Sequence, residues 1–571
     1  MIHFKSTFKR ALSVALFMFI IILLGTSSIA SAKKSNNRKN PAPTATPTPR
    51  PKRPTPTPLP SPTPLPTPTP TPTPPARPPL EGYKNVVYVE DLGAYGDGVH
   101  DDTKAINNAL NSGADAVVFE ANATYKTDNI IAMQTSGVTI FGNNASLFTD
   151  DDYRKSTNYY EWYFNVEASN IVIKDLRIEA RESRPVGYKT QFVVIDASNI
   201  TVDNCTFYIP STVIPNGYYR DLEYSNLDLF TGWHNVTIKN STFINLADVD
   251  RGVNAEFRDI WNHEASDLLF TNNTLTSNCH DEILASFTGS TTTIRNLNIT
   301  NNTINALAGI YSKPRTLGVS LGYDGFGLDN VTFSNNTLNV SADYAAIAIG
   351  DSTNVTVNNN TINFTPLVNW NPVYVFKGAY LDNNVNVINN TIEVLNNPSA
   401  NFAGISDGYI KVSYNNITSN TNVSEALFYN NGVVSNNTIT VNGNTKRLGS
   451  SIISFKDNMV TFNGTISTMF EFYNKTFYSD ITIVDNIINC NTDSNNNETL
   501  FMLNGTTMNG YVFTLSNNTV SCPMSTTDKS FYYMSISDKT RQTIVLTNNT
   551  IPMFIHTYIE GGMSSIYNIV S

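Results

Sequence analysis

The sequence predicts an all-β fold, a right-handed parallel β-helix with a short N-terminal capping helix, on three observations. One phrase, apolar-x-apolar-x-Asn-Asn-Thr-apolar, recurs from about residue 138 onward, as in Val355–Ile362. Its copies follow one another at steps of 21 to 36 residues, the period of a solenoid whose units bury their apolar faces by stacking. Apolar residues alternate on both sides of the Asn pair, which indicates two short strands joined by a sharp bend. No stretch between copies has helical periodicity, which disfavours leucine-rich and ankyrin-type arrays.

The first residue of each Asn pair marks a predicted bend. Asparagine tolerates the left-handed backbone conformation that a bend of one or two residues needs. Stacked asparagines can also hydrogen-bond along a column with a repeat of about 4.8 Å. The bends are predicted at Asn204, Asn240, Asn272, Asn301, Asn335, Asn359 and Asn389, with weaker copies at Tyr414, Asn436, Asp457, Asp485, Asn517 and Asn548 and degenerate copies around Gly142 and Asp175.

The distribution of charge separates the N-terminal segment from the rest of the chain. No Asp or Glu precedes Glu81, whereas eleven of the 37 Lys and Arg residues do. The remaining 26 bases face 47 acids, so residues 81–571 carry a net charge of −21. A body with this charge should repel nucleic acid and anionic membranes, so neither is an expected partner. Its carboxylates could hold hard cations such as Ca²⁺.

The N-terminal segment is expected to direct secretion. Residues 1–32 contain basic residues, an apolar core and a terminal Ala-Ser-Ala, the pattern of a cleaved signal peptide. An uncleaved membrane anchor is the alternative; after cleavage no membrane insertion is expected. Residues 33–82 are rich in Pro and Thr and predict an extended linker that either holds the body off a surface or binds an anionic cell-wall polymer through its bases. The body, residues 83–571, is therefore predicted to be extracellular or attached to the cell surface.

A short segment before the repeats predicts a cap. Asp101 and Asp102 are suited to the start of a short helix, and Gly96 and Gly98 supply the turn before it. The helix is expected to bury Ala105, Ile106, Ala109 and Leu110.

The run from Val89 to Ile106, followed by Val117–Phe119 and Tyr125, resembles the opening segment of the pectate-lyase-like β-helix superfamily. Members of that superfamily include pectin-degrading enzymes, related glycoside hydrolases and phage tail-spike enzymes. The resemblance covers residues 89–310 and implies that the segment caps one end of the solenoid. It also implies a polysaccharide partner.

Charged residues gather between Asn204 and Asn335, where the steps between repeats are long. Long steps predict loops that build a binding wall. Three strands before successive bends can be aligned as Asn226–Phe230, Arg258–Trp261 and Asp281–Leu284.

This alignment predicts an outward column of Asp228, Asp259 and Glu282 on adjacent rungs. Like charges about 4.8 Å apart require a shared proton, a cation or a basic neighbour. Glycosidases hold two carboxyl groups about 5–5.5 Å apart for retention and about 6.5–9.5 Å apart for inversion. Glu282 is expected to be the acid, with Asp228 or Asp259 activating water. The alternative is that these acids only keep an exposed surface soluble. The alignment points Leu229, Ile260 and Ile283 inward.

Other candidate residues surround this column. His263 and His280 are expected to be ordinary surface or loop residues, with proton transfer by either of them, or by Asp281, as the alternative. Arg251 and Arg258 could compensate charge or bind a substrate carboxylate. The aromatic residues that could stack on sugar rings are Trp233, Trp261, Tyr218, Tyr219 and Tyr224.

The chain lacks the Gly-His-Gly and Arg-Ile-Lys signatures of polygalacturonases, so no catalytic residue of those enzymes is assigned to it. A lyase of the superfamily would use the three acids of the column to hold Ca²⁺ and a base that could be Arg258, Arg251 or Lys189. A hydrolase would need no cofactor. The prediction is a polysaccharide hydrolase or lyase, with a non-catalytic adhesin or wall-binding solenoid as the alternative.

Four cysteines are too few for a disulfide scaffold. Cys490 and Cys522 occupy the same slot of successive repeats, within reach of a disulfide if stacked, although two buried thiols remain an alternative. Cys205 and Cys279 do not align and are expected to be free.

Overall fold

The structure is a computed structural model. It describes residues 80–149, 160–180, 188–210, 223–247, 251–261, 263–278, 282–288, 292–306, 317–322, 327–350, 352–368, 372–378, 384–430, 432–473, 479–491, 499–504, 512–521, 532–535, 543–550 and 557–560. The predicted signal peptide and nearly all of the predicted linker lie outside these ranges. Within them, no helix is both long enough and apolar enough to cross a membrane.

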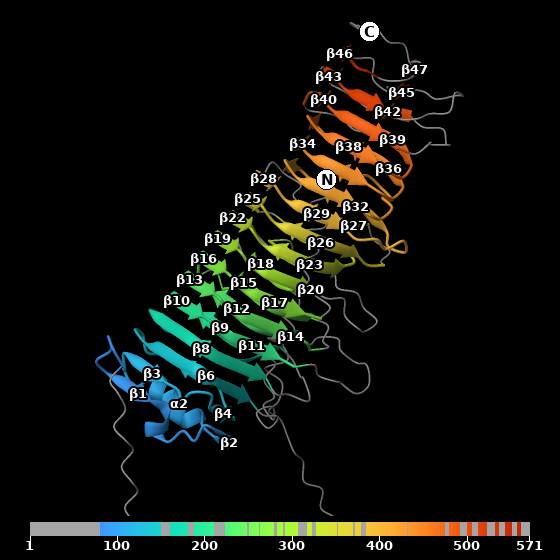
Figure 1. Cartoon of the computed structure of the whole chain (residues 1–571). Helices are drawn as coiled ribbons and strands as arrows, with labels where there is room; N and C mark the ends of the chain where they lie inside the picture. Colours follow the sequence, from blue (N-terminus) through green and yellow to red (C-terminus); the bar gives the residue numbers. More distant parts are fainter. Residues whose placement is uncertain are drawn as a thin grey trace, which may run out of the picture. The chain divides into compact units, whose positions relative to one another are not determined.

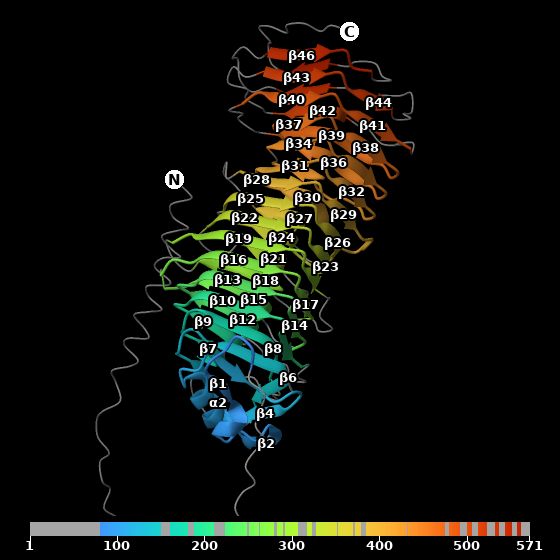
Figure 2. The ribbon, with the colours of Figure 1, turned by 60° about the vertical axis from the view of Figure 1, so that its left-hand side comes forward.

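Parallel strands stack along one axis in three ladders, from the N-terminal cap to the last strands (Figures 1 and 2). The first ladder precedes each Asn bend, the second follows it, and the third returns the chain to the next coil. The first two ladders join in one sheet of 31 strands because β6 and β8 run through both, and the third ladder is a separate sheet of 16 strands. The predicted right-handed parallel β-helix is confirmed.

The first ladder contains β1 (Val86–Tyr88), β3 (Ala116–Val118), β6 (Thr139–Thr149), β8 (Ile171–Ala180), β10 (Ser198–Asp203), β13 (His234–Lys239), β16 (Ser266–Thr271), β19 (Ile294–Thr300), β22 (Leu328–Ser334), β25 (Thr353–Asn358), β28 (Val385–Ile388), β31 (Ile410–Ser413), β34 (Val433–Ser435), β37 (Ser454–Lys456), β40 (Ile481–Val484), β43 (Val512–Ser516) and β46 (Thr543–Thr547). The second ladder adds β2 (Asp97–Asp101), β4 (Thr124–Thr127), β11 (Thr206–Ile209), β14 (Thr242–Asn245), β17 (Thr274–Ser277), β20 (Thr303–Ala306), β23 (Thr337–Ala342), β26 (Thr361–Pro366), β29 (Thr391–Val394), β32 (Asn416–Ser419), β35 (Thr438–Val441), β38 (Met459–Phe462), β41 (Ile487–Cys490) and β44 (Thr519–Ser521). The third ladder contains β5 (Ile131–Met133), β7 (Tyr160–Val166), β9 (Tyr188–Ile195), β12 (Glu223–Thr231), β15 (Arg251–Asp259), β18 (Leu284–Thr288), β21 (Leu317–Leu321), β24 (Ala345–Ile349), β27 (Val373–Gly378), β30 (Phe402–Asp407), β33 (Phe428–Tyr429), β36 (Thr445–Ser450), β39 (Ile466–Tyr473), β42 (Thr499–Asn504), β45 (Tyr532–Ser535) and β47 (Thr557–Glu560).

Each predicted bend from Asn204 to Asn548 has a positive backbone φ, between 53° and 60°. One left-handed residue turns the chain from the first ladder into the second, and asparagine accepts this conformation at low cost. The next residue points into the core. From Asn273 to Asn549 these inner asparagines form a continuous column in which the side-chain oxygen of each accepts the backbone N–H of the preceding one. The predicted asparagine column is thus observed inside the solenoid.

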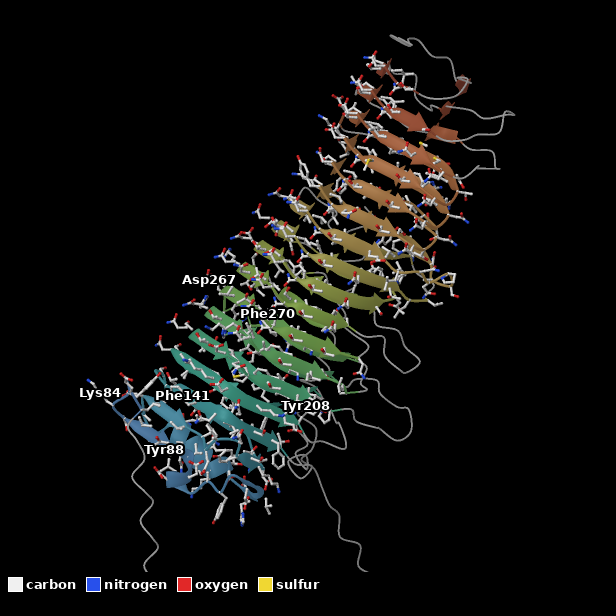
Figure 3. The ribbon with its side chains drawn as sticks, viewed as in Figure 1. Lys84, Tyr88, Phe141, Tyr208, Asp267 and Phe270 are labelled. Carbon is white, nitrogen blue, oxygen red and sulfur yellow. The ribbon has the colours of Figure 1, made fainter. Side chains whose placement is uncertain are left out.

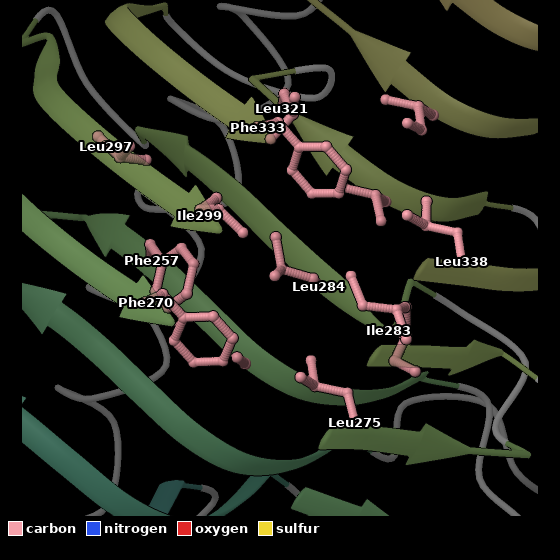
Figure 4. Close-up of a cluster of buried hydrophobic side chains, with 14 of the residues drawn as sticks. Phe257, Phe270, Leu275, Ile283, Leu284, Leu297, Ile299, Leu321, Phe333 and Leu338 are labelled. Atoms are coloured by element: carbon pink, nitrogen blue, oxygen red, sulfur yellow. The ribbon is translucent and has the colours of Figure 1, made fainter. Parts of the chain in front are cut away.

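The core fills the space between the ladders with residues that alternate along each strand (Figure 4). Aromatic rings stack from coil to coil, with 4.9 Å between the ring centroids of Phe207 and Phe243 and 5.7 Å between those of Phe243 and Phe270. Figure 3 labels Phe270, which is buried, and Asp267, which is exposed on the same strand. This alternation identifies the side of each strand that solvent or a ligand can reach.

The N-terminal cap consists of a 3₁₀ turn, η1 (Val89–Leu92), and the helix α2 (Thr103–Leu110). The four residues predicted to be buried are buried, and Gly96 and Gly98 have positive φ. Asp101 accepts the backbone N–H of Thr103 at 3.0 Å, whereas Asp102 is buried and accepts the N–H groups of Tyr95 and Gly96. The carboxylates of the cap therefore have structural partners, as the resemblance implied.

The described cysteines follow the prediction in part. Cys205 is free and buried, and burial raises the pKa of its thiol to about 12, so it stays protonated. Cys490 is disulfide-bonded, which excludes a free thiol at this position. Its predicted partner Cys522, like Cys279, lies outside the described residues.

Candidate functional site

Two carboxylates meet on the outer face of the third ladder. The register of β12 and β15 places Asp228 directly beside Glu256, and Glu256 lies beside Ala285 of β18. Both carboxylates are fully buried. They alternate with core residues, such as Leu227 and Leu229 on β12, so they leave the opposite face of the strand.

The predicted column of Asp228, Asp259 and Glu282 is therefore wrong. Asp259 pairs with Thr288 at the end of β15, three residues beyond the rung of Asp228. Ile283 accepts the backbone N–H of Asn254, so Glu282, which precedes it, also lies away from Asp259. The alignment failed because the loops between the second and third ladders differ in length, so counting residues does not give the register.

Arg258 joins the two carboxylates. Its guanidinium donates hydrogen bonds to both oxygens of Asp228, with 3.0 Å between Nε and Oδ1. The same Nε lies 2.8 Å from Oε2 of Glu256 in an ion pair. The Arg258 side chain is 14% exposed, so the triad is shielded from water and its ion pairs are stronger than surface pairs. The predicted charge compensation by Arg258 is observed.

An aromatic group adjoins this triad. Phe230 stacks under the Arg258 guanidinium, with 5.3 Å between the ring centroid and the Cζ atom. Trp162 and Trp261 contact Phe230 at centroid distances of 5.3 and 4.9 Å. Trp261 is 49% exposed and can offer a ring face to a sugar.

Two buried asparagines on the same face carry oxygens without donors. Asn226 and Asn254 lie on adjacent rungs, two residues before Asp228 and Glu256. Their Nδ2 groups are occupied, since Asn226 donates to Gln191 and Asn254 donates to backbone carbonyls. Their Oδ1 atoms accept no hydrogen bond from any residue that the structure describes. A ligand hydroxyl group could satisfy such an acceptor.

Asp259 and His263 have other partners. Asp259 is buried and accepts hydrogen bonds from the hydroxyls of Thr231 at 2.7 Å and Thr292 at 2.5 Å. It also accepts the N–H of His263 at 3.2 Å, so it holds the bend after β15. His263 is 44% exposed, and its Nδ1 lies 2.7 Å from Oδ1 of Asp196. This geometry gives Asp259 a structural role and makes His263 a surface residue.

The structure places Trp233, Ile260 and Glu282 differently from the sequence prediction. Trp233 is buried in the core, and its Nε1–H donates to the carbonyls of Leu229 and Arg258, so it cannot stack on a sugar. Ile260 is only partly buried and is absent from the described core, whereas Leu229 and Ile283 lie inside it as expected. Glu282 was predicted to face outward in a column of acids, but it is 5% exposed and lies just before β18.

The proposed calcium ligands do not fit a metal site. In the described part of the chain, no group of three or more His, Cys, Asp and Glu residues could hold a metal ion, and Asp228, Asp259 and Glu282 are no exception. Both oxygens of Asp228 are bonded to Arg258. Calcium-dependent chemistry at these three residues therefore has no geometric support.

Several candidate residues cannot be placed. Tyr218, Tyr219, His280 and Asp281 lie outside the described residues. Lys189, Tyr224 and Arg251 belong to strands β9, β12 and β15, but their side chains lie outside the description.

Glu256 was missed in the sequence, although a local signal was present. The strand Asn226-Leu-Asp-Leu has the same order of asparagine, apolar residue, acid and apolar residue as Asn254-Ala-Glu-Phe. Aligning these two runs gives the observed register. Phe230 and Trp162 had no comparable signal, because the contacts of Phe230 with Trp162 and Trp261 depend on how the coils stack.

Comparisons with known proteins find one family model that matches part of this chain. Residues 86–311 match the family described as "Rhamnogalacturonase A/epimerase, pectate lyase-like". No curated protein matches the chain. Similar solved structures include PfbA, a surface adhesin of Streptococcus pneumoniae (14% identity, 67% of this chain and 93% of that chain, TM-score 0.36).

Two further similar structures are a domain of a phage tailspike protein and a module of an epimerase. They are the enzymatically active domain of bacteriophage CBA120 tailspike protein 2 (14% identity, 59% of this chain and 48% of that chain, TM-score 0.40) and the A-module of the Azotobacter vinelandii mannuronan C-5 epimerase AlgE6 (11% identity, 82% and 100%, TM-score 0.25). The family match falls on the segment that holds the cap and the first coils, so residues 86–311 are similar to the pectate-lyase-like family.

Proposed function

We propose that this protein is a secreted or surface-tethered glycoside hydrolase that cleaves polysaccharide on the outer face of the third ladder. The observation that carries the proposal is the pair of buried carboxylates, Asp228 and Glu256, joined by Arg258 beside the exposed ring of Trp261. Buried charges are costly unless they are paired or used. A family match to polysaccharide-acting proteins by description supports the substrate class.

The spacing favours a retaining reaction. One oxygen of Asp228 and one of Glu256 lie within 3.0 Å of the same nitrogen of Arg258. They are therefore no more than about 6 Å apart, which is below the about 6.5–9.5 Å of inverting enzymes and compatible with the about 5–5.5 Å of retaining ones. Asp228, held ionised by two hydrogen bonds from Arg258, is the proposed nucleophile. Glu256, on the adjacent rung and beside the same guanidinium, is the proposed general acid.

The surrounding residues would bind and orient the sugar. Trp261 offers an apolar ring to the C–H face of a sugar unit. The free Oδ1 atoms of Asn226 and Asn254 would accept sugar hydroxyls next to the two carboxylates. After the leaving sugar departs, a water molecule would hydrolyse the glycosyl-Asp228 intermediate, with Glu256 acting as the base.

A non-catalytic polysaccharide-binding protein is the second candidate. The observation that favours it is that both oxygens of Asp228 are hydrogen-bonded to Arg258. A carboxylate held in this way is a weaker nucleophile, but each oxygen can still accept a sugar hydroxyl.

The decisive experiment compares the whole chain with a Glu256→Gln variant on plant, algal and microbial polysaccharides. Reducing ends and unsaturated products are recorded with calcium and with chelator. We expect cleavage in the wild type that persists in chelator and falls at least a thousandfold in Glu256→Gln. Products of retained anomeric configuration, followed by NMR, would support the assignment of Asp228.

The control is Glu264→Gln, which changes an exposed glutamate in the following bend. Trp261→Ala, at an exposed position, should raise KM while leaving the melting temperature unchanged. Binding without cleavage in the wild type would leave the binding protein as the function. Unsaturated products that require calcium would contradict a hydrolase.

A further inference from the structure

A second group of charged side chains lies on the outer face of the third ladder. It begins five rungs beyond Asp228, which is about 24 Å at the usual strand spacing. The register leads from Asp228 through Glu256, Ala285, Ser320 and Ala348 to Lys377 and Asp407. No residue of this second group takes part in the triad around Arg258.

Lys377 and Asp407 form its centre. They lie on adjacent rungs, and the Lys377 ammonium donates a hydrogen bond to Oδ2 of Asp407. Their side chains are 14% and 7% exposed. The other oxygen, Oδ1 of Asp407, is buried and accepts no hydrogen bond from any residue in the described ranges. A buried acceptor without a donor costs about 1–3 kcal/mol, so a ligand that brings a hydroxyl would gain from filling it.

Tyrosines surround the pair. The Lys377 ammonium lies 4.7 Å from the ring centroid of Tyr374 and 5.9 Å from that of Tyr344, which orients it. Burial, followed by the charges of Asp407 and Glu425, raises the pKa of Tyr374, so its hydroxyl remains a donor at neutral pH. Tyr344 and Tyr429 are partly exposed, and Tyr429 lies directly beside Asp407.

The charges around the pair balance. Glu425 lies 3.6 Å from Arg447 and 3.9 Å from Lys446, and Arg447 also pairs with Glu471. Among the described residues, the ion pairs that include Lys377 and Asp407 join three basic side chains to three acidic ones. Such a cluster offers no net positive charge to a polyanion.

We propose that Lys377, Asp407, Tyr344 and Tyr429 form a second saccharide-binding site, which takes a neutral, hydroxyl-rich sugar unit. One sugar hydroxyl donates to Oδ1 of Asp407, and another accepts from the Lys377 ammonium, while a tyrosine ring packs on the C–H face. The site shares its face with the first site, so a long glycan that reaches both gains avidity. The proposal does not depend on cleavage at the first site.

The test measures binding of the whole chain to an array of immobilised neutral and uronate-containing oligosaccharides. The tightest neutral oligosaccharide is then titrated by calorimetry in solution. The variant Lys377→Gln/Asp407→Asn keeps a hydrogen-bonding pair of similar size and removes both charges. We expect its affinity to fall at least tenfold. The matched control, Lys446→Gln/Glu425→Gln, neutralises the exposed neighbouring pair and should change affinity less than twofold.

Two outcomes would overturn the proposal. The first is that no neutral oligosaccharide on the array binds the protein. The second is that Lys377→Gln/Asp407→Asn binds with unchanged affinity. If that variant does not fold, Tyr344→Ala replaces it, with the same tenfold expectation. Glu256→Gln separates the two sites, because it should abolish cleavage and leave this binding intact. Loss of cleavage alone therefore tests the first site only.

Discussion

At the scale of single residues, Asp343 shows how burial changes a carboxyl group in this fold. It lies between β23 and β24 and is 8% exposed. Loss of hydration raises the pKa of this carboxyl from 3.8 to about 6. The folded chain therefore holds the proton up to about pH 6, whereas the unfolded chain releases it near pH 3.8. This contribution to stability is fully present below about pH 4 and is lost as the pH rises through 6.

The variant Asp343→Asn mimics the protonated side chain. We expect no change in melting temperature at pH 4. At pH 7.5 we expect stabilisation relative to the wild type, by roughly 2–3 kcal/mol for a shift of two pKa units. Differential scanning calorimetry at the two pH values measures both effects.

The control is Asp329→Asn on the neighbouring strand β22. Hydrogen bonds from Thr353 and Asn354 lower the pKa of Asp329, so its replacement should lower the melting temperature at pH 7.5. An equal effect of Asp343→Asn at both pH values would contradict the account.

At the scale of elements, the inner asparagine column holds successive coils in register. Asn390 donates its amide to Oδ1 of Asn415 at 3.0 Å and to the carbonyl of Val357 at 2.9 Å. Its own Oδ1 accepts the backbone N–H of Asn360 at 2.9 Å. Each asparagine thus satisfies buried backbone groups at a bend where the strand ladders leave them unpaired.

The variant Asn390→Ala should lower the melting temperature by several degrees. It leaves the N–H of Asn360 buried without an acceptor, and each such orphan costs about 1–3 kcal/mol. Thermal unfolding followed by circular dichroism measures the change. Asn339→Ala is the control, because the side chain of this exposed asparagine bonds only to the side-chain amides of Asn305 and Asn363 among the described residues. Similar melting temperatures for the two variants would contradict the assigned role of the column.

At the scale of the whole body, the ladders need a cover at the N-terminal end. Parallel strands at the end of a solenoid expose unpaired backbone groups and core side chains, which invite association. Helix α2 supplies this cover by burying Ile106 and Leu110 completely.

The variant Ile106→Asp should release the cap and produce oligomers or aggregates, because a charge in the core cannot be paired there. Size-exclusion chromatography with light scattering measures the association. Asn108→Asp, on the exposed side of the same helix, should remain as monodisperse as the wild type. A monodisperse Ile106→Asp variant with wild-type melting behaviour would show that the cap is dispensable.

The sequence by itself determined the β-helix, its bends, its asparagine column and its cap. These features repeat, and each depends on residues close together in the chain, as with the left-handed Asn359 and the buried Asn360 that follows it. Local conformational preference and the alternation of apolar residues are enough to predict them. The sequence also located the charged region between Asn204 and Asn335, but it did not show which of the acids in this region lie next to each other.

The tertiary structure alone decided which acids meet. Asp228 pairs with Glu256, and Asp259 turns away to hold a bend, because loops of unequal length set the register of the third ladder. Trp233 and Trp261 are both tryptophans, but Trp233 is buried in the core, whereas Trp261 lies exposed beside the triad. Lys377 and Asp407 likewise become partners only through the stacking of two coils. Register and burial arise from contacts between distant residues, so no local pattern encodes them.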